Sequence, residues 1–131
     1  MSTAPIYKSV KIDKNGGSVS LKVSNPNSPQ SISGETDEYA VLSNPPLNTY
    51  SFNTAQPQNI LGKPDTVDQH YFAVDGAVLN NNDNPPTQYR VQIEIWQDGK
   101  QLDIVYKPES GPGQISNTDQ YFLHKFQLLA S

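Results

Sequence analysis

The sequence predicts an all-β fold, with an antiparallel β-sandwich or jelly roll as the preferred architecture. The 131 residues include 11 Pro and 8 Gly, and only 17% are charged. This composition suits short strands joined by many turns better than it suits helices. Several segments also alternate apolar and polar residues, which is the pattern of half-buried strands. Between two of these segments lies Asp98-Gly99, the dipeptide that favours a two-residue hairpin turn.

The length of the chain fits one domain, and residues 1–131 are expected to form a single all-β domain. The chain has no Cys, which excludes disulfides and thiolate metal sites. The net charge is −4 and the nine Lys and Arg residues are scattered, so we expect no nucleic-acid partner. No segment approaches the roughly 18 apolar residues of a membrane span. The first residues lack the pattern of a signal peptide, which favours a cytoplasmic protein or one released by a non-Sec route.

The strongest local prediction is a hairpin over residues 89–106. Its first strand alternates Val91, Ile93 and Ile95 with polar residues, and Asp98-Gly99 supplies a type I′ turn. If Gln97 and Lys100 flank this turn, the pattern pairs Ile95 with Leu102, Ile93 with Ile104 and Val91 with Tyr106. One face of the hairpin is then wholly apolar.

A second hairpin is predicted over residues 6–23, where two alternating segments flank the turn Asn15-Gly16-Gly17. Five pairs of identical residues lie the same 82 positions apart (89 − 7), which predicts an internal duplication. The pairs are Tyr7 and Tyr89, Gly17 and Gly99, Pro26 and Pro108, Asp37 and Asp119, and Tyr39 and Tyr121.

A β-trefoil is the alternative architecture. Asn-Pro-Pro occurs at 44–46 and again at 84–86, so three units of about 40 residues would end near Pro46, Pro86 and the C-terminus. The sandwich is preferred because the middle unit lacks a recognisable hairpin. Residues 53–68 are predicted to form a long connection. The last strand, residues 121–129, places Phe122, His124, Phe126 and Leu128 on one side and is predicted to be central.

The outward face of the 89–106 hairpin is the candidate binding site. The predicted register places Trp96 beside Gln101, Glu94 opposite Asp103 and Gln92 opposite Val105. An exposed Trp flanked by amides and acids suits a sugar, because the ring stacks on C–H faces while polar groups bind hydroxyls. The competing interpretation is that Trp96 packs under a loop and that nearby cations screen the acids.

A run of side-chain oxygens from residue 75 to residue 84 is a candidate Ca²⁺ site, since hard cations prefer oxygen ligands. The candidate ligands are Asp75, Asn80, Asn82 and Asp83. The same run is equally good turn chemistry, and no other cofactor is predicted.

These features favour a non-enzymatic binding module whose partner is a carbohydrate or a protein surface. His70 and His124 are expected to be packed, hydrogen-bonded residues, and no catalytic motif is present. The first alternative is an assembly subunit of an appendage, capsid or toxin complex, in which the same face or an unpaired edge strand forms a homo-oligomer or meets another chain. The second alternative is a protease inhibitor that presents the loop 108–113.

Overall fold

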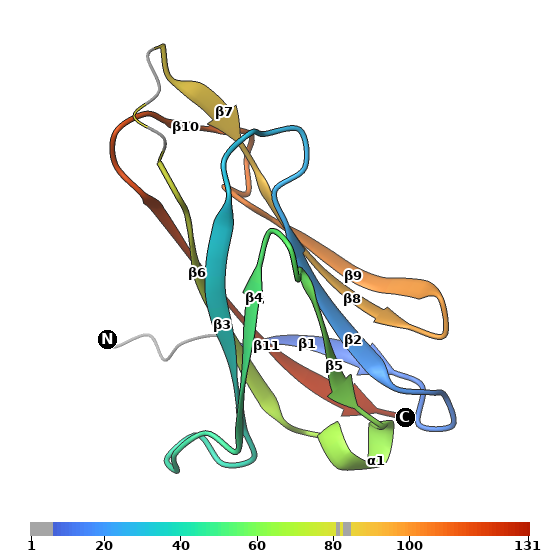
Figure 1. Cartoon of the computed structure of the whole chain (residues 1–131). Helices are drawn as coiled ribbons and strands as arrows, with labels where there is room; N and C mark the ends of the chain where they lie inside the picture. The colour runs from blue at the N-terminus through green and yellow to red at the C-terminus, as the bar shows by residue number, and fades with distance from the viewer. Residues whose placement is uncertain (1–6, 81, 83–84) are drawn as a thin grey trace.

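The chain folds into two β-sheets packed face to face, which confirms the predicted all-β sandwich (Figure 1). The computed structural model describes residues 7–80, 82 and 85–131. Their elements are β1 (Lys8–Ile12), β2 (Val19–Ser24), β3 (Ile32–Tyr39), β4 (Asn48–Asn53), β5 (Gln58–Gly62), α1 (Pro64–Val67), β6 (Tyr71–Val78), β7 (Thr87–Tyr89), β8 (Val91–Gln97), β9 (Lys100–Lys107), β10 (Gly113–Ile115) and β11 (Gln120–Ala130).

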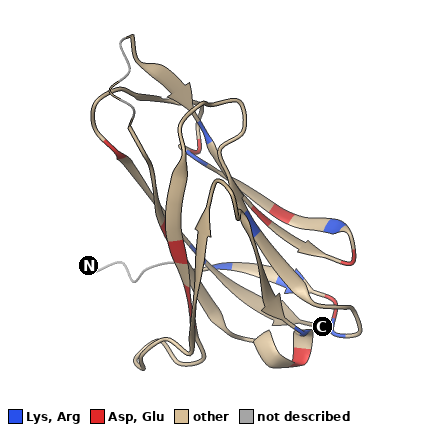
Figure 2. Cartoon of the chain, in the orientation of Figure 1, with Lys and Arg blue, Asp and Glu red and all other residues tan. Residues whose placement is uncertain are grey.

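The large sheet has the strand order β1-β11-β6-β3-β4, and the small sheet has the order β5-β2-β8-β9. All pairings in both sheets are antiparallel except that of β1, which runs parallel to β11. Strands β7 and β10 form a separate ribbon at one end of the molecule (Figure 1). At the two sides of the sandwich, β4 contacts β5 and β1 contacts β9. Acidic and basic residues are mixed over both sheets (Figure 2).

The core lies between the sheets and is built from alternate residues of their strands. Strand β11 was predicted to be central, and it is flanked by β1 and β6. Its Phe126 stacks on Phe72 of β6 with ring centroids 5.0 Å apart. Burying large rings of this kind is a principal source of stability in a sheet core. The other buried core residues include Ile12, Leu21, Ile32, Phe52, Val74, Ile93, Ile95, Ile115, Phe122 and Leu128.

The 89–106 hairpin is confirmed, but its predicted register is wrong beyond the first pairs. Asp98 and Gly99 have φ values of 51° and 73°, as a type I′ turn requires, and Gln97 pairs with Lys100. A bulge between Ile95 and Trp96 then leaves Leu102 without a cross-strand partner. Each later β9 residue therefore lies on the face opposite to the predicted one. Pattern and turn length cannot reveal such a bulge.

The predicted hairpin over residues 6–23 is also wrong. Strand β1 pairs with β11 in the large sheet, whereas β2 pairs with β5 and β8 in the small sheet. The loop 13–18 therefore crosses from one layer to the other. The structure does not confirm the internal duplication or the trefoil, because the two segments that were predicted to be equivalent differ in their pairing.

The predicted long connection over residues 53–68 contains β5 and α1. The two apolar residues of β5 lie on opposite sides of the strand. Leu61 is buried in the core, whereas Ile60 is 66% exposed. Within the described residues, no helix has the length and apolar character needed to span a membrane, since α1 has only four residues.

Candidate functional site

The outer face of the small sheet brings together four of the five predicted binding residues. Trp96, Glu94 and Gln92 alternate along β8, and Gln101 pairs with Trp96 from β9. On the other side of β8, Ser20 pairs with Trp96 and Lys22 pairs with Glu94. Directly opposed residues share one face of a sheet. These side chains therefore form a single surface on the outside of the sandwich.

Trp96 is half-buried on this surface. Its indole Nε1 is hidden from solvent and has no hydrogen-bond partner among the described residues. Because the nitrogen is buried, the part of the ring that solvent reaches is carbon. An aromatic carbon surface of this kind stacks on apolar groups of a ligand.

A groove of about 330 Å³ borders Trp96. Two hydroxyl side chains, two amides, one ammonium group and one carboxylate line it together with the indole. These residues are Ser18, Ser20, Lys22, Gln58, Trp96, Gln97, Asp98 and Gly99. The groove thus combines one aromatic side chain with hydrogen-bond donors and acceptors, which is the composition of a site for a polar small molecule.

Glu94 and Gln92 have different surroundings along β8. Glu94 is only 7% exposed, and its Oε1 accepts a 2.8 Å hydrogen bond from Gln101 Nε2. Gln92 lies farther along β8 and lines a second hollow of about 230 Å³ with Tyr106 and Arg90. The Arg90 guanidinium stacks 4.2 Å from the Tyr106 ring centroid. Gln92 and Trp96 therefore border separate hollows on the same face.

Asp103, the fifth predicted binding residue, does not belong to this face. It pairs with the buried Ile95, and its Oδ1 forms a 2.8 Å ion pair with Lys8 Nζ at the edge of the sandwich. The bulge at Leu102 causes this difference, because it moves Asp103 to the inner side of β9. The predicted pairing of Glu94 with Asp103 is therefore wrong, since Glu94 pairs with Ile104.

The candidate Ca²⁺ ligands are spread over two elements and a loop. Asp75 lies in β6, which ends at Val78, and Asn80 lies two positions beyond the end of that strand. Asn80 donates through both its backbone N and its Nδ2 to Asp119 Oδ1, at 2.9 and 2.6 Å. Asn82 has φ 57°, a left-handed conformation typical of turns, and Asp83 lies outside the described residues. The described part of the chain contains no cluster of three His, Asp or Glu that could hold a metal.

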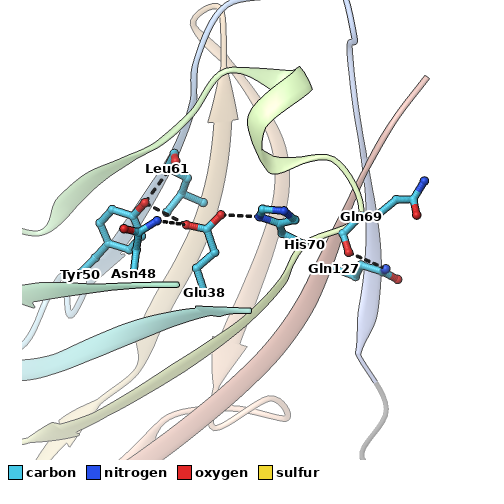
Figure 3. A network of polar contacts seen from close by, with 7 residues as sticks. All are labelled: Glu38, Asn48, Tyr50, Leu61, Gln69, His70 and Gln127. Carbon is cyan, nitrogen blue, oxygen red and sulfur yellow. Dashed lines mark hydrogen bonds and ion pairs between the residues drawn. The ribbon is translucent and has the colours of Figure 1, made fainter. Parts of the chain in front are cut away.

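A buried polar network at the end of β3 was not predicted (Figure 3). Glu38 is 1% exposed, and its Oε1 accepts hydrogen bonds from Asn48 Nδ2 at 2.9 Å and Tyr50 OH at 3.1 Å. Its Oε2 lies 2.6 Å from His70 Nδ1. The Tyr50 hydroxyl also lies 3.3 Å from the carbonyl oxygen of Leu61.

This network joins four segments of the fold. Burial, followed by the charge of Glu38, raises the pKa of Tyr50 to about 12, so the hydroxyl remains a donor at neutral pH. The Glu38 carboxylate thereby ties β3 to β4 and to the residue that precedes β6. The expectation that His70 is a packed, hydrogen-bonded residue is confirmed. His124 is also packed, but its Nε2 has no hydrogen-bond partner among the described residues.

With this geometry in view, the chain can be compared with known proteins. No family model, curated protein or solved structure matches it. Its function must therefore be inferred from its side chains and their arrangement.

Of the eight residues that line the groove, only Trp96 was among the predicted binding residues. Gln97, Asp98 and Gly99 belong to the predicted hairpin but were not assigned to the site. Ser18, Ser20 and Lys22 lie in or beside β2, and Gln58 begins β5. The alternation of Ser20 and Lys22 with buried residues could have placed them on an outer face. It could not have shown that this face continues that of Trp96, because the pairing of β2 with β8 joins residues far apart in the sequence.

Proposed function

We propose that this protein is a non-enzymatic carbohydrate-binding module and that it binds sugar in the groove beside Trp96. The observation that carries this proposal is the lining of the groove. Trp96 is its aromatic side chain, and the other side chains are hydroxyl, amide, ammonium and carboxylate groups. A sugar likewise combines an apolar surface, its C–H faces, with a polar one, its rim of hydroxyl groups.

The chemistry of each side chain supports this assignment. The exposed carbon of the indole can stack on the C–H face of a pyranose ring. The hydroxyls of Ser18 and Ser20 can both donate and accept hydrogen bonds, while Lys22 donates and Asp98 accepts. The volume of about 330 Å³ lies at the lower end of the usual range for small-molecule sites. We therefore expect a short saccharide or the end of a longer glycan.

The groove supports binding better than hydrolysis. Glycoside hydrolysis ordinarily needs two carboxyl groups placed on either side of the scissile bond. Asp98 is the carboxylate among the residues that line this groove. Glu94 lies on the same sheet face but is 7% exposed and bonded to Gln101.

The test is a broad glycan array probed with the parent protein and with Trp96→Ala. We expect the parent to bind a defined set of glycans and the variant to lose that binding. Tyr121→Ala is the matched control, because Tyr121 is a 79% exposed aromatic residue of the other sheet. The control should bind like the parent, and circular dichroism should show that all three proteins are folded.

Intrinsic fluorescence gives a second readout of the same groove. Trp96 is the only Trp in the chain, so its emission reports on this site alone. A glycan identified on the array should shift or quench the emission in a saturable way. A folded parent that binds no glycan, or binding that Trp96→Ala retains, would refute the proposal.

A further inference from the structure

Within the part of the chain that the structure describes, the first half of β11 has a free edge in the large sheet. Strand β11 pairs with β6 over residues 120–127, but β1 pairs with it only over residues 126–130 (Figure 1). Among the described residues, no strand pairs with the first half of β11 on the side of β1. Before Phe126, no strand pairing with a described residue occupies that side of the β11 backbone. An unpaired edge of this kind can accept an additional strand.

The hydrogen bonds at the end of β11 show which backbone groups face the free edge. Leu128 N donates to the His70 carbonyl oxygen at 3.1 Å, on the side of β6, and Ser131 N donates to the Ile12 carbonyl oxygen at 3.1 Å, on the side of β1. Successive residues of a strand point to opposite sides, and the pairings of β11 contain no register shift. Tyr121 and Leu123 therefore direct their N–H and C=O groups toward the free edge.

A cleft of about 630 Å³ lies beside this edge, between β11 and the edge strand β9. Its walls include the apolar residues Ile104, Val105 and Leu123. At the end nearest β1, the ion pair between Lys8 and Asp103 spans the space between the two sheets. The cleft thus offers apolar walls together with backbone that no described strand pairs.

The charged groups around the cleft carry an excess of one positive charge, because three lysines face Glu109 and the Asp103 that pairs with Lys8. Lys8, Lys107 and Lys125 line it with one carboxylate, Glu109, which forms a 2.8 Å ion pair with Lys107. His124 also lines the cleft; burial, followed by the ammonium group of Lys107, lowers its pKa to about 4, so it is neutral at neutral pH. Lys8 and Lys107 are each paired with a carboxylate, so Lys125 supplies the excess positive charge, in contrast with the net charge of −4 of the chain.

We propose that the cleft binds an extended, acidic peptide segment of another protein, which adds as a strand to the free edge of β11. Tyr121 and Leu123 supply the backbone hydrogen bonds. Side chains alternate along an added strand, so one set meets the apolar walls and the other set meets the lysines. The occupant is therefore a segment in which apolar residues alternate with Asp or Glu.

The probe for this site is a fluorescein-labelled peptide of seven residues that alternate Asp and Val, with blocked ends. Its counterpart has Lys in place of Asp. Fluorescence anisotropy should show saturable binding of the acidic peptide and at least about tenfold weaker binding of the basic one, because like charges oppose each other at the cleft. Hydrogen exchange at the amides of Tyr121 and Leu123 should slow when the acidic peptide is bound.

Leu123→Pro tests the backbone contact, since Pro removes one edge N–H and is tolerated on strand edges. It should abolish binding, whereas Leu123→Thr, which keeps the N–H, should retain it. Combining Lys107→Gln with Lys125→Gln should weaken binding about tenfold. Lys63→Gln is the control, because Lys63 is exposed and lies outside the cleft.

Three results would overturn this proposal: no binding of the acidic peptide, equal binding of both peptides, or unchanged exchange at Tyr121 and Leu123. A dimer that forms with rising concentration and is lost in Leu123→Pro would assign the edge to a second copy of the chain instead. Trp96→Ala should leave peptide binding unchanged. The outcome is therefore independent of the proposed carbohydrate site.

Discussion

Residues 7–23 and 89–106 have the same design in the sequence and opposite outcomes in the fold. Each has two alternating segments around a Gly-containing turn. Residues 89–106 form a hairpin within the small sheet, whereas residues 7–23 divide between the two sheets. Alternation therefore predicts a strand and its buried side but not the strand that pairs with it.

Linker length explains part of this difference. The link between β8 and β9 has only two residues, both in left-handed conformations, and such a link returns the chain beside itself. The link between β1 and β2 has six residues, enough to cross the roughly 10 Å between packed sheets.

The two regions are also joined to each other. Gln97 Oε1 accepts a 2.9 Å bond from Asp13 N, and Gln97 Nε2 donates to the carbonyl oxygens of Asp13 and Gly17 at 2.9 and 3.1 Å. Gly17 N donates to Asp98 at 3.1 and 3.2 Å. The end of the β8–β9 hairpin thus holds the loop that crosses between the sheets.

The largest effect should come from removing the Gln97 contacts. Gln97→Leu keeps the side-chain volume but removes three hydrogen bonds to the crossing loop. Asp13 N and Gly17 O lose the amide partner, while Asp13 O keeps only its 3.0 Å bond from Gly16 N. Since Gln97 is only 4% exposed, we expect a loss of about 3 kcal/mol in the free energy of unfolding, measured by urea denaturation. Gln88→Leu, at an exposed position of β7, should change it by less than about 0.5 kcal/mol. Equal effects of the two substitutions would show that the loop does not depend on Gln97.

Gly17→Ala should have the next largest effect. Its new Cβ would lie 2.8 Å from Asp98 Oδ1, so the carboxylate must move and lose its bond to Gly17 N. We expect a loss of about 2 kcal/mol in the parent and clearly less in an Asp98→Ala background. A double-mutant cycle measures this coupling. Additive losses would mean that the two residues are energetically independent.

Gly99→Ala separates backbone strain from crowding. No atom lies within 4 Å of a Cβ placed at Gly99, but its φ of +73° is unfavourable for Ala. We expect a loss of about 1 kcal/mol, smaller than that of Gly17→Ala. Thermal unfolding of both variants under the same conditions tests the order. A larger loss at Gly99 would indicate that the turn limits stability more than the crossing loop does.

Asp98→Asn should have the smallest effect. Asn tolerates the left-handed conformation that Asp98 adopts, and it keeps one oxygen to accept the bond from Gly17 N. The bond is exposed, so we expect a change of less than about 0.5 kcal/mol in the free energy of unfolding. A loss above 1 kcal/mol would show that the charge of Asp98 is needed to hold the loop.

The candidate site was predicted in part from local pattern. Trp96, Glu94, Gln92 and Gln101 share the face that alternation and the Asp98-Gly99 turn assigned to them. Asp103 does not, because the bulge at Leu102 arises from packing against the core and leaves no mark in the alternation. The other walls of the groove come from β2 and β5, whose pairing is long-range.

By itself, the sequence determined the all-β class, the turn at Asp98-Gly99 and the buried side of β11. Each of these depends on residues close together in the chain, where backbone preference and burial act directly. Only the tertiary structure decided that β1 joins β11, that Asp103 turns toward Lys8, and that Ser20 and Gln58 lie near Trp96. Those outcomes depend on which strand edges meet when the two sheets pack, and a strand's own residues do not specify its neighbour.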